Sequence, residues 1–319
     1  MGSNQFFQTN SASLLFNLIE CVINEEELMA FLLRQDVNDV GEKYFPFKDL
    51  AQTIIDVLPE YAFADYEQPI KPHLYMKKVR EAARCMYDTN TYKAINKYFI
   101  ENDVTFKEEA EAARAIGRGE FGEILLHLLL RDFKGTIPLV SKLYFKDSRG
   151  VPAHGFDAVH ISPDENILWL GESKLYTGAT AGLTKLIEDL KQHLTKEFLS
   201  NEYTIIKKNV TANNIPNRDY WIERLSKNTR LEDMITQVNI PMLCVYNDTD
   251  RFKKCLDESI EDIAPVFEPK FRELKQYFDD NNDAPLKNRL NIILFLFPVM
   301  DKEDFVLQLH ERLYHLQKV

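Results

Sequence analysis

Residues 155–174, GFDAVHISPDENILWLGESK, predict a β-hairpin. Two largely apolar runs flank a loop of turn-forming residues, PDEN. If Ser162 closes this loop opposite Ile167, counting five residues outward from each places Asp157 opposite Glu172. Residues directly opposite one another share a face of the sheet, so the hairpin brings two carboxylates to the end of an otherwise apolar face.

This pair of carboxylates needs a physical explanation. Opposed Cβ atoms lie about 4.5–5.5 Å apart, and like charges there destabilise a sheet, the more so when burial removes their hydration. Either one carboxyl group is protonated or a cation lies between the two. Lys174 follows Glu172 by two residues and shares its face. A metal-assisted hydrolase uses these groups; the alternative is a surface hairpin whose polar end is solvated.

The composition limits the classes of protein to consider. The chain has 319 residues, 45% hydrophobic and 28% charged, enough for one large or two ordinary domains. No apolar run is long enough to span a bilayer, and the four cysteines form no CxxC pair, so we expect a cytoplasmic protein with free thiols and no membrane partner. The net charge of −11 argues against a simple basic nucleic-acid-binding module.

The pattern of apolar residues divides the chain into two regions. Residues 1–105 are predicted to be a mainly helical scaffold or docking region, and residues 106–319 a second domain. Helical spacing in the first region is shown by Leu14, Leu15, Leu18, Ile19 and Val22, and then by Leu28, Phe31 and Leu32.

The second region is predicted to open with a helix over about residues 106–132. Its apolar stripe comprises Phe121, Ile124, Leu125, Leu128 and Leu129. Glu120, Glu123 and His127 lie on another face of the same helix. Either these glutamates are solvated, or one of them reaches the sheet and joins the two hairpin carboxylates.

An amphipathic helix is predicted after the hairpin, over about residues 183–198. Lys185, Lys191 and Gln192 lie on its polar side, at the start of the one sustained basic stretch in an acidic chain. We interpret these three residues as candidates for contact with a phosphate backbone, with a solvated helix face as the alternative.

The remaining elements are predicted from apolar runs. Strands are expected over residues 137–145, 240–246 and 290–297, and a terminal helix over about 302–316. The two histidines of that last helix, His310 and His315, are expected on its surface.

The order of elements from residue 106, helix, three strands, helix and strand, resembles the PD-(D/E)xK nuclease superfamily. Asp157, Glu172 and Lys174 match its motif, with Phe156 where the motif name has proline. The resemblance implies an α/β fold: a restriction-endonuclease-like mixed sheet flanked by helices, here preceded by the mainly helical N-terminal region.

Three strings narrow the resemblance. GEFGE (residues 119–123), HGFD (154–157) and WLGESK (169–174) are similar to the HamA family of the Hachiman antiphage defence system. This similarity covers roughly residues 106–250. It implies a DNase effector that acts on DNA beside HamB, a superfamily 2 helicase, and whose activity is restrained until DNA is damaged or exposed.

The resemblance also implies roles for single residues. Asp157, Glu172, the Ser173 carbonyl and Glu123 are expected to hold Mg²⁺, with Mn²⁺ as a substitute, because hard cations prefer oxygen ligands. Lys174 is expected to orient or deprotonate a water, or to stabilise charge on the phosphate. Glu120 is the reserve for Glu123 on the helix.

Two other functions remain open from the sequence. The chain is alternatively a non-catalytic subunit that binds DNA or regulates the helicase, or a stand-alone repair or restriction endonuclease. The sequence argues against a serine or cysteine hydrolase, since it has no GxSxG or Cys/His signature.

Overall fold

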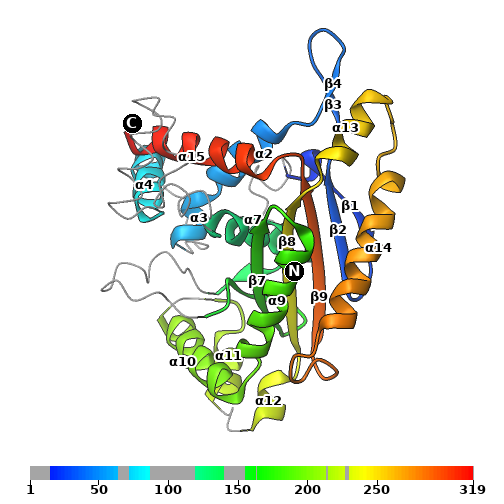
Figure 1. Cartoon of the computed structure of the whole chain (residues 1–319). Coiled ribbons are helices and arrows are strands. Elements are labelled where there is room, and N and C mark those ends of the chain that lie inside the picture. The colour runs from blue at the N-terminus through cyan, green and yellow to red at the C-terminus, as the bar shows by residue number, and fades with distance from the viewer. Residues whose placement is uncertain are drawn as a thin grey trace, which may run out of the picture.

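A mixed β-sheet forms the centre of the molecule (Figure 1). The computed structural model describes residues 15–63, 72–86, 119–139, 155–162, 164–212, 215–226 and 230–318. Within these residues the sheet has seven strands in the order β1-β2-β9-β8-β7-β6-β5. The strands are β1 (Ile19–Asn24), β2 (Leu28–Leu33), β5 (Ile137–Pro138), β6 (Ala158–Ser162), β7 (Ile167–Tyr176), β8 (Val238–Asn247) and β9 (Asn291–Val299).

The middle of the sheet is parallel and both of its edges are antiparallel. The pairs β7–β8, β8–β9 and β9–β2 are parallel, whereas the pairs β1–β2, β6–β7 and β5–β6 are antiparallel. Parallel strands need cover on both faces, which is why β8 and β9 consist of continuous apolar runs and are almost wholly buried. The predicted α/β mixed sheet is therefore confirmed.

Helices cover both faces of this sheet (Figure 1). α9 (Ala179–His193) packs on β7 and β8 and lies beside α14 (Ala264–Asn281), whereas α7 (Glu120–Lys134) packs against β6 and β7 from the other side. Behind α7 lie α2 (Phe47–Asp56), α3 (Leu58–Phe63), α4 (Pro72–Cys85) and α15 (Lys302–Lys318). The further elements are β3 (Asp36–Val37), β4 (Lys43–Tyr44), α10 (Lys196–Ala212), α11 (Arg218–Ser226), α12 (Leu231–Ile235) and α13 (Thr249–Asp257).

The helical prediction for the first apolar residues holds for residues 15–18 but is wrong from residue 19 onward. Residues 19–33 form β1 and β2, and β2 pairs in parallel with β9 near the other end of the chain. Every residue of β2 is buried. Its run LMAFLL is too short for periodicity to separate strand from helix, and the pairing with β9 decides. The helical character of the N-terminal region is otherwise confirmed by α2, α3 and α4.

The later predictions are mostly confirmed. The strands expected at 240–246 and 290–297 are β8 and β9, and the terminal helix is α15. The helix expected over 183–198 divides instead into α9 and α10, which meet at residues 194–195. The boundary at residue 105, the start of the helix expected over 106–132, and most of the strand expected over 137–145 lie outside the described residues.

The expectation for the histidines of α15 is correct for one of them. His315 is exposed, but His310 is buried and its ring lies 5.0 Å from that of Phe121. The reason is its place on the helix: His310 shares a face with Val306 and Leu313, and that face packs on the rest of the protein. In the described chain, no helix combines the length and the apolar character needed to cross a bilayer.

Gly171 shows how closely α7 approaches β7. A Cβ atom at this position would lie 2.9 Å from Leu126 Cδ2 of α7 and 3.0 Å from Pro241 Cγ of β8. We expect Gly171→Ala to lower the free energy of unfolding by about 1–3 kcal/mol, because the added methyl group overpacks this contact.

The matched control is Gly119→Ala, measured with it by urea denaturation. Gly119 has helical φ and ψ of −77° and −11°, and a Cβ atom there would meet no described residue within 4 Å outside its own stretch of chain. Its substitution should change stability by no more than about 0.5 kcal/mol. Equal stability of the two variants would contradict the close contact.

Candidate functional site

The hairpin that carries the candidate residues has the predicted register. Ser162 pairs with Ile167, and the ladder continues through Val159 and Leu170 to Ala158 opposite Gly171. Asp157 directly precedes β6, so the pairing ends one residue before it. Its half-buried carboxylate turns to the neighbouring strand, where Oδ2 accepts hydrogen bonds from the backbone N–H of Ser173 (2.9 Å) and from its hydroxyl (3.0 Å).

Glu172 lies on the face of β7 that α9 covers. Its side chain is 3% exposed, so the charge has lost nearly all contact with bulk water. Two basic side chains lie at ion-pair distance from the carboxylate: His193 Nδ1 of α9 is 2.8 Å from Oε1, and Lys174 Nζ is 3.9 Å from Oε2. A buried carboxylate is stable only when such partners face it.

Lys174 forms its closer ion pair with α9. Its Nζ lies 2.5 Å from Asp189 Oδ2. Burial favours the neutral amine, but the hydrogen bond to Asp189 and the charges of Glu172 and Asp157 outweigh it and raise the pKa of Lys174 above its ordinary value. The lysine is therefore a charged ammonium that feels both motif carboxylates.

The helix carboxylates of α7 converge on the other side of β7. Tyr61 of α3 donates a hydrogen bond from its hydroxyl to Glu123 Oε2 at 2.7 Å. Burial, followed by the charges of Glu123, Asp157 and Glu120, raises the pKa of Tyr61 well above 10. The phenol of Tyr61 therefore stays protonated and donates its hydrogen bond. Its raised pKa also indicates that all three carboxylates lie close enough to act on it.

Gly122 explains how α7 comes so near. A Cβ atom there would lie 3.2 Å from Ser173 Oγ, closer than nearly all real contacts. The small residue between the two glutamates thus lets the helix cross β7 directly at the motif. Of the two glutamates, Glu123 accepts the hydrogen bond from Tyr61, whereas Glu120 acts on that phenol through its charge.

A buried polar network continues along α7 away from the carboxylates. His127 Nδ1 lies 3.1 Å from His160 Nε2 of β6, and His160 Nδ1 lies 2.7 Å from Thr136 Oγ1. Glu60 of α3 joins the network through His127 Nε2 (3.4 Å) and Arg131 (2.6 Å). The sequence placed His127 with the two glutamates, but it is 1% exposed and belongs to this network.

The three residues proposed to contact substrate lie on α9 but not in the cluster around Glu172. Lys185 pairs with Glu188 at 2.7 Å, and Lys191 pairs with Asp283, which follows α14, at 2.5 Å. Gln192 is exposed. The acidic partners offset the positive charge on which the phosphate-binding interpretation depends.

Three site residues were missed from the sequence. Asp189 and His193 are four residues apart on an evident helix, a spacing that puts both on one face, so the pattern of that helix offered a signal. Tyr61 offered none, since it lies 62 residues before Glu123 and the contact depends on how α3 packs.

The donor set suits a hard divalent cation, since it is made of carboxylate and carbonyl oxygens. In the described part of the chain, however, no three His, Cys, Asp or Glu side chains are gathered closely enough to hold a metal ion. Each carboxylate faces a polar group of the protein: Asp157 and Glu123 accept hydrogen bonds from Ser173 and Tyr61, and Glu172 lies at ion-pair distance from His193. The residues suit a cation chemically, but Glu172 and Glu123 lie on opposite sides of β7, so gathering both around one ion would require a rearrangement of the elements around β7.

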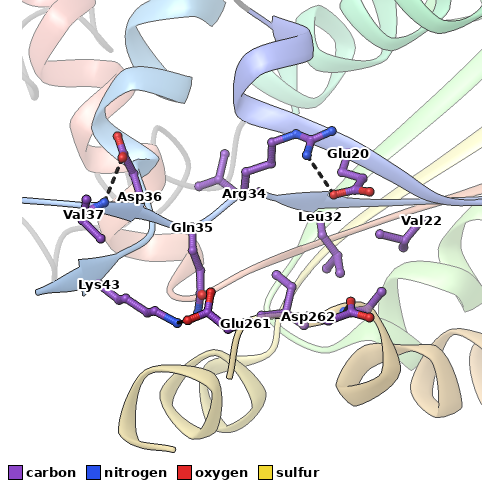
Figure 2. A pocket seen from close by; sticks show the side chains of 13 residues that line it. Glu20, Val22, Leu32, Arg34, Gln35, Asp36, Val37, Lys43, Glu261 and Asp262 are labelled. Carbon is purple, nitrogen blue, oxygen red and sulfur yellow. Dashed lines mark hydrogen bonds and ion pairs between the residues drawn. The ribbon is translucent and has the colours of Figure 1, made fainter. Parts of the chain in front are cut away.

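A surface pocket of about 390 Å³ lies at the opposite edge of the sheet. Figure 2 shows its lining, which comes from β1, β2, the residues after β2 and the start of α14. Four of its charged side chains form two ion pairs, Arg34 with Glu20 at 3.1 Å and Lys43 with Glu261 at 2.7 Å (Figure 2). The pocket shares no residue with the carboxylate cluster, so we do not place the chemistry there.

We expect the Tyr61–Glu123 contact to contribute measurably to stability. In a double-mutant cycle of Tyr61→Phe and Glu123→Gln, urea denaturation should give a coupling energy of about 1.5–3 kcal/mol, the range for a hydrogen bond to a charged group. Tyr220→Phe is the control, because that hydroxyl makes a 3.4 Å contact with Gln237 at the surface. A coupling energy near zero would show that Glu123 does not depend on Tyr61.

The buried histidine pair makes stability depend on pH. Burial, followed by the charges of His127 and Arg131, holds the pKa of His160 well below 6.5. Below pH 6.5 the unfolded chain therefore binds a proton that the folded chain does not, and the free energy of unfolding should fall with pH by about 1.4 kcal/mol per unit. Stability from this residue is present above pH 6.5 and is lost as the pH falls.

Urea denaturation of the wild type and His160→Gln between pH 7 and pH 5.5 measures this slope. In His160→Gln, the slope of the free energy of unfolding against pH should be smaller by the contribution of one proton, about 1.4 kcal/mol per pH unit. The exposed His315→Gln is the control and should keep the slope of the wild type. If His160→Gln keeps that slope as well, His160 is not the group responsible.

Comparison with known families places the chain. The model of the HamA family matches residues 9–313, nearly the whole sequence, so the chain belongs to the HamA family of the Hachiman antiphage defence system. Among curated proteins and among solved structures, no significant match was found.

Proposed function

We propose that this HamA-family protein is a metal-dependent DNase of the PD-(D/E)xK type, acting in complex with the helicase subunit HamB. The proposal rests chiefly on the register of the β6–β7 hairpin, which brings Asp157 against Ser173, beside Glu172 and Lys174. On the side of β7 that faces α7, Glu123 is added. Charged side chains therefore surround residues 172–174 of β7 on both faces of the sheet.

The divalent cation would be Mg²⁺, with Mn²⁺ as a substitute. Asp157, Glu172, Glu123 and the Ser173 carbonyl are the residues that would hold it. When bound, such an ion polarises a scissile phosphate and lowers the pKa of a coordinated water. The side chain of Glu172 is 3% exposed, and so little contact with water strengthens its interactions with neighbouring charges.

The chain's own side chains have separate parts in this proposal. Lys174 supplies a positive charge for the non-bridging oxygens of the phosphate, since its neighbours keep it protonated. Tyr61 holds Glu123 in place from α3. Lys185, Lys191 and Gln192 remain candidates for contact with the DNA backbone, which would have to displace Glu188 and Asp283 from the two lysines.

The acidity of the chain agrees with delivery by a partner. A net charge of −11 gives the protein little affinity of its own for the phosphate backbone. A helicase that already holds DNA removes that requirement. In this proposal the N-terminal helices offer the docking surface, and host DNA is spared because the subunit binds DNA weakly alone.

One observation favours a second candidate, a non-catalytic subunit that regulates the helicase. Each motif carboxylate already has a hydrogen-bond or ion-pair partner in the protein, and the described residues hold no ready group of three metal ligands. Such a site could be a structural remnant of the nuclease fold. Activity measurements on matched variants separate the two candidates.

We expect Asp157→Asn, Glu172→Gln and Lys174→Met each to lower Mg²⁺-dependent cleavage of linear and plasmid DNA by at least about 100-fold, because each removes a charge that the transition state requires. The assay compares the protein with and without the helicase, Mg²⁺ and ATP. Arg272→Gln is the control: its ion pair with Glu25 is on the surface and joins α14 to the residues after β1, outside the motif.

Folding of each variant is checked by circular dichroism and by co-purification with the helicase. Cleavage by all three site variants at the level of Arg272→Gln would contradict the nuclease assignment. Loss of cleavage together with full protection against phage would instead favour the regulatory candidate.

A further inference from the structure

Helix α9 engages both charged residues of the β7 motif. Asp189 and His193 lie one turn apart on it, and Glu172 and Lys174 lie two residues apart on β7, on the face that α9 covers. Asp189 Oδ2 is 2.5 Å from Lys174 Nζ, and His193 Nδ1 is 2.8 Å from Glu172 Oε1. The two helix residues thus pair one to one with the two strand residues; we call Asp189 and His193 the α9 clamp.

The clamp determines how close the lysine and the glutamate come. Lys174 Nζ is 3.9 Å from Glu172 Oε2, much farther than from Asp189. Both carboxylates compete for one ammonium on a flexible four-carbon stem, and Asp189 has the shorter contact. Without Asp189, the ammonium would lose its nearest anion and would move onto Glu172.

Aromatic contacts hold the ring of His193 in place beside Glu172. Its ring stacks on Phe198 with centroids 4.1 Å apart and an interplanar angle of 17°, and Phe156 contacts it edge-on at 5.2 Å. Phe156 is fully buried and precedes Asp157 directly. The aromatic contacts fix the plane of the imidazole, so Nδ1 meets one oxygen of Glu172 while the other turns toward Lys174.

We propose that the α9 clamp positions the cation site: Asp189 draws Lys174 away from Glu172, and His193 orients the Glu172 carboxylate, so that a divalent cation can compete for its second oxygen. This rests on the proposed function, since it assigns a role to residues beside the same site. Asp189 and His193 are positioning residues, because they act through Lys174 and Glu172.

Mn²⁺ binding to the full chain, measured by electron paramagnetic resonance of the free ion, tests the proposal without any DNA cleavage. Asp189→Asn should weaken Mn²⁺ binding by about tenfold or more, the usual effect of losing a residue that orients a metal ligand. Glu188→Gln is the matched control, since it breaks an exposed ion pair with Lys185 on the same helix and should bind Mn²⁺ like the wild type.

A second substitution distinguishes this role from a merely structural one. If Asp189 acts by keeping Lys174 off Glu172, removing the lysine as well should restore binding. Lys174→Met/Asp189→Asn should therefore bind Mn²⁺ more tightly than Asp189→Asn alone. For the histidine, His193→Leu should weaken binding, and His193→Asn, whose amide nitrogen can occupy the place of Nδ1, should recover most of it.

The outcomes separate the two proposals. A wild-type chain that binds no Mn²⁺, or binds it equally after Asp157→Asn, overturns the proposed function and the clamp with it. A wild-type chain that binds Mn²⁺ through Asp157 while Asp189→Asn matches Glu188→Gln overturns the clamp alone. Failure of the double variant to recover binding likewise rejects the competition for Lys174.

Discussion

The burial of Glu172 is the constraint on which the rest of the site depends. A carboxylate on a strand in the interior of a sheet has lost its water, and the protein must supply charge or hydrogen bonds in return. Lys174 lies on the same face because a strand alternates, and α9 brings His193 and Asp189 to that face because the helix packs on β7 and β8. The arrangement balances two negative and one or two positive charges within one buried layer. Each charged side chain of this layer therefore has a partner of opposite charge or a histidine within 4 Å.

On the opposite face of β7, the carboxylates also have partners in the protein, but these come from other elements. There the small residue Gly122 lets α7 approach Ser173, and the glutamates of that helix come near Asp157. The compensating donor is the phenol of Tyr61, which comes from α3 in the N-terminal region. Glu60, the residue before it, binds His127 and Arg131 of α7. Two consecutive residues of α3 therefore connect the N-terminal region to α7, the helix that carries Glu123. A movement of α3 would change the contacts of that carboxylate.

The sequence predicted the parts of this site that follow from local geometry. The turn PDEN determined the register of the hairpin, and the alternation of β7 put Glu172 and Lys174 on one face, as found. The sequence could not predict the contact that Asp157 makes. This residue lies just before β6, outside the paired strand, and its carboxylate accepts a hydrogen bond from Ser173. The sequence also failed for Leu28 to Leu33, since a six-residue apolar run becomes a strand only because β9, over 250 residues later, lies beside it. The partners of the site, Tyr61, Asp189 and His193, depend on packing between elements, and no local pattern reports that.

The partners of the motif carboxylates and the net negative charge of the chain both oppose cleavage of DNA by the subunit alone. A nuclease whose metal ligands stood ready, on a surface attractive to DNA, would cleave whatever DNA it met. If the chain is the proposed nuclease, each carboxylate would have to exchange its partner in the protein for a cation, and the exposed lysines of α9 would have to exchange Glu188 and Asp283 for phosphate, while the net charge of −11 opposes binding to DNA. Each exchange adds a cost that binding energy from elsewhere must meet. In a HamA-family subunit, a partner that holds the DNA can supply that energy, so restraint would follow from the ground state of the site and would require no separate inhibitor.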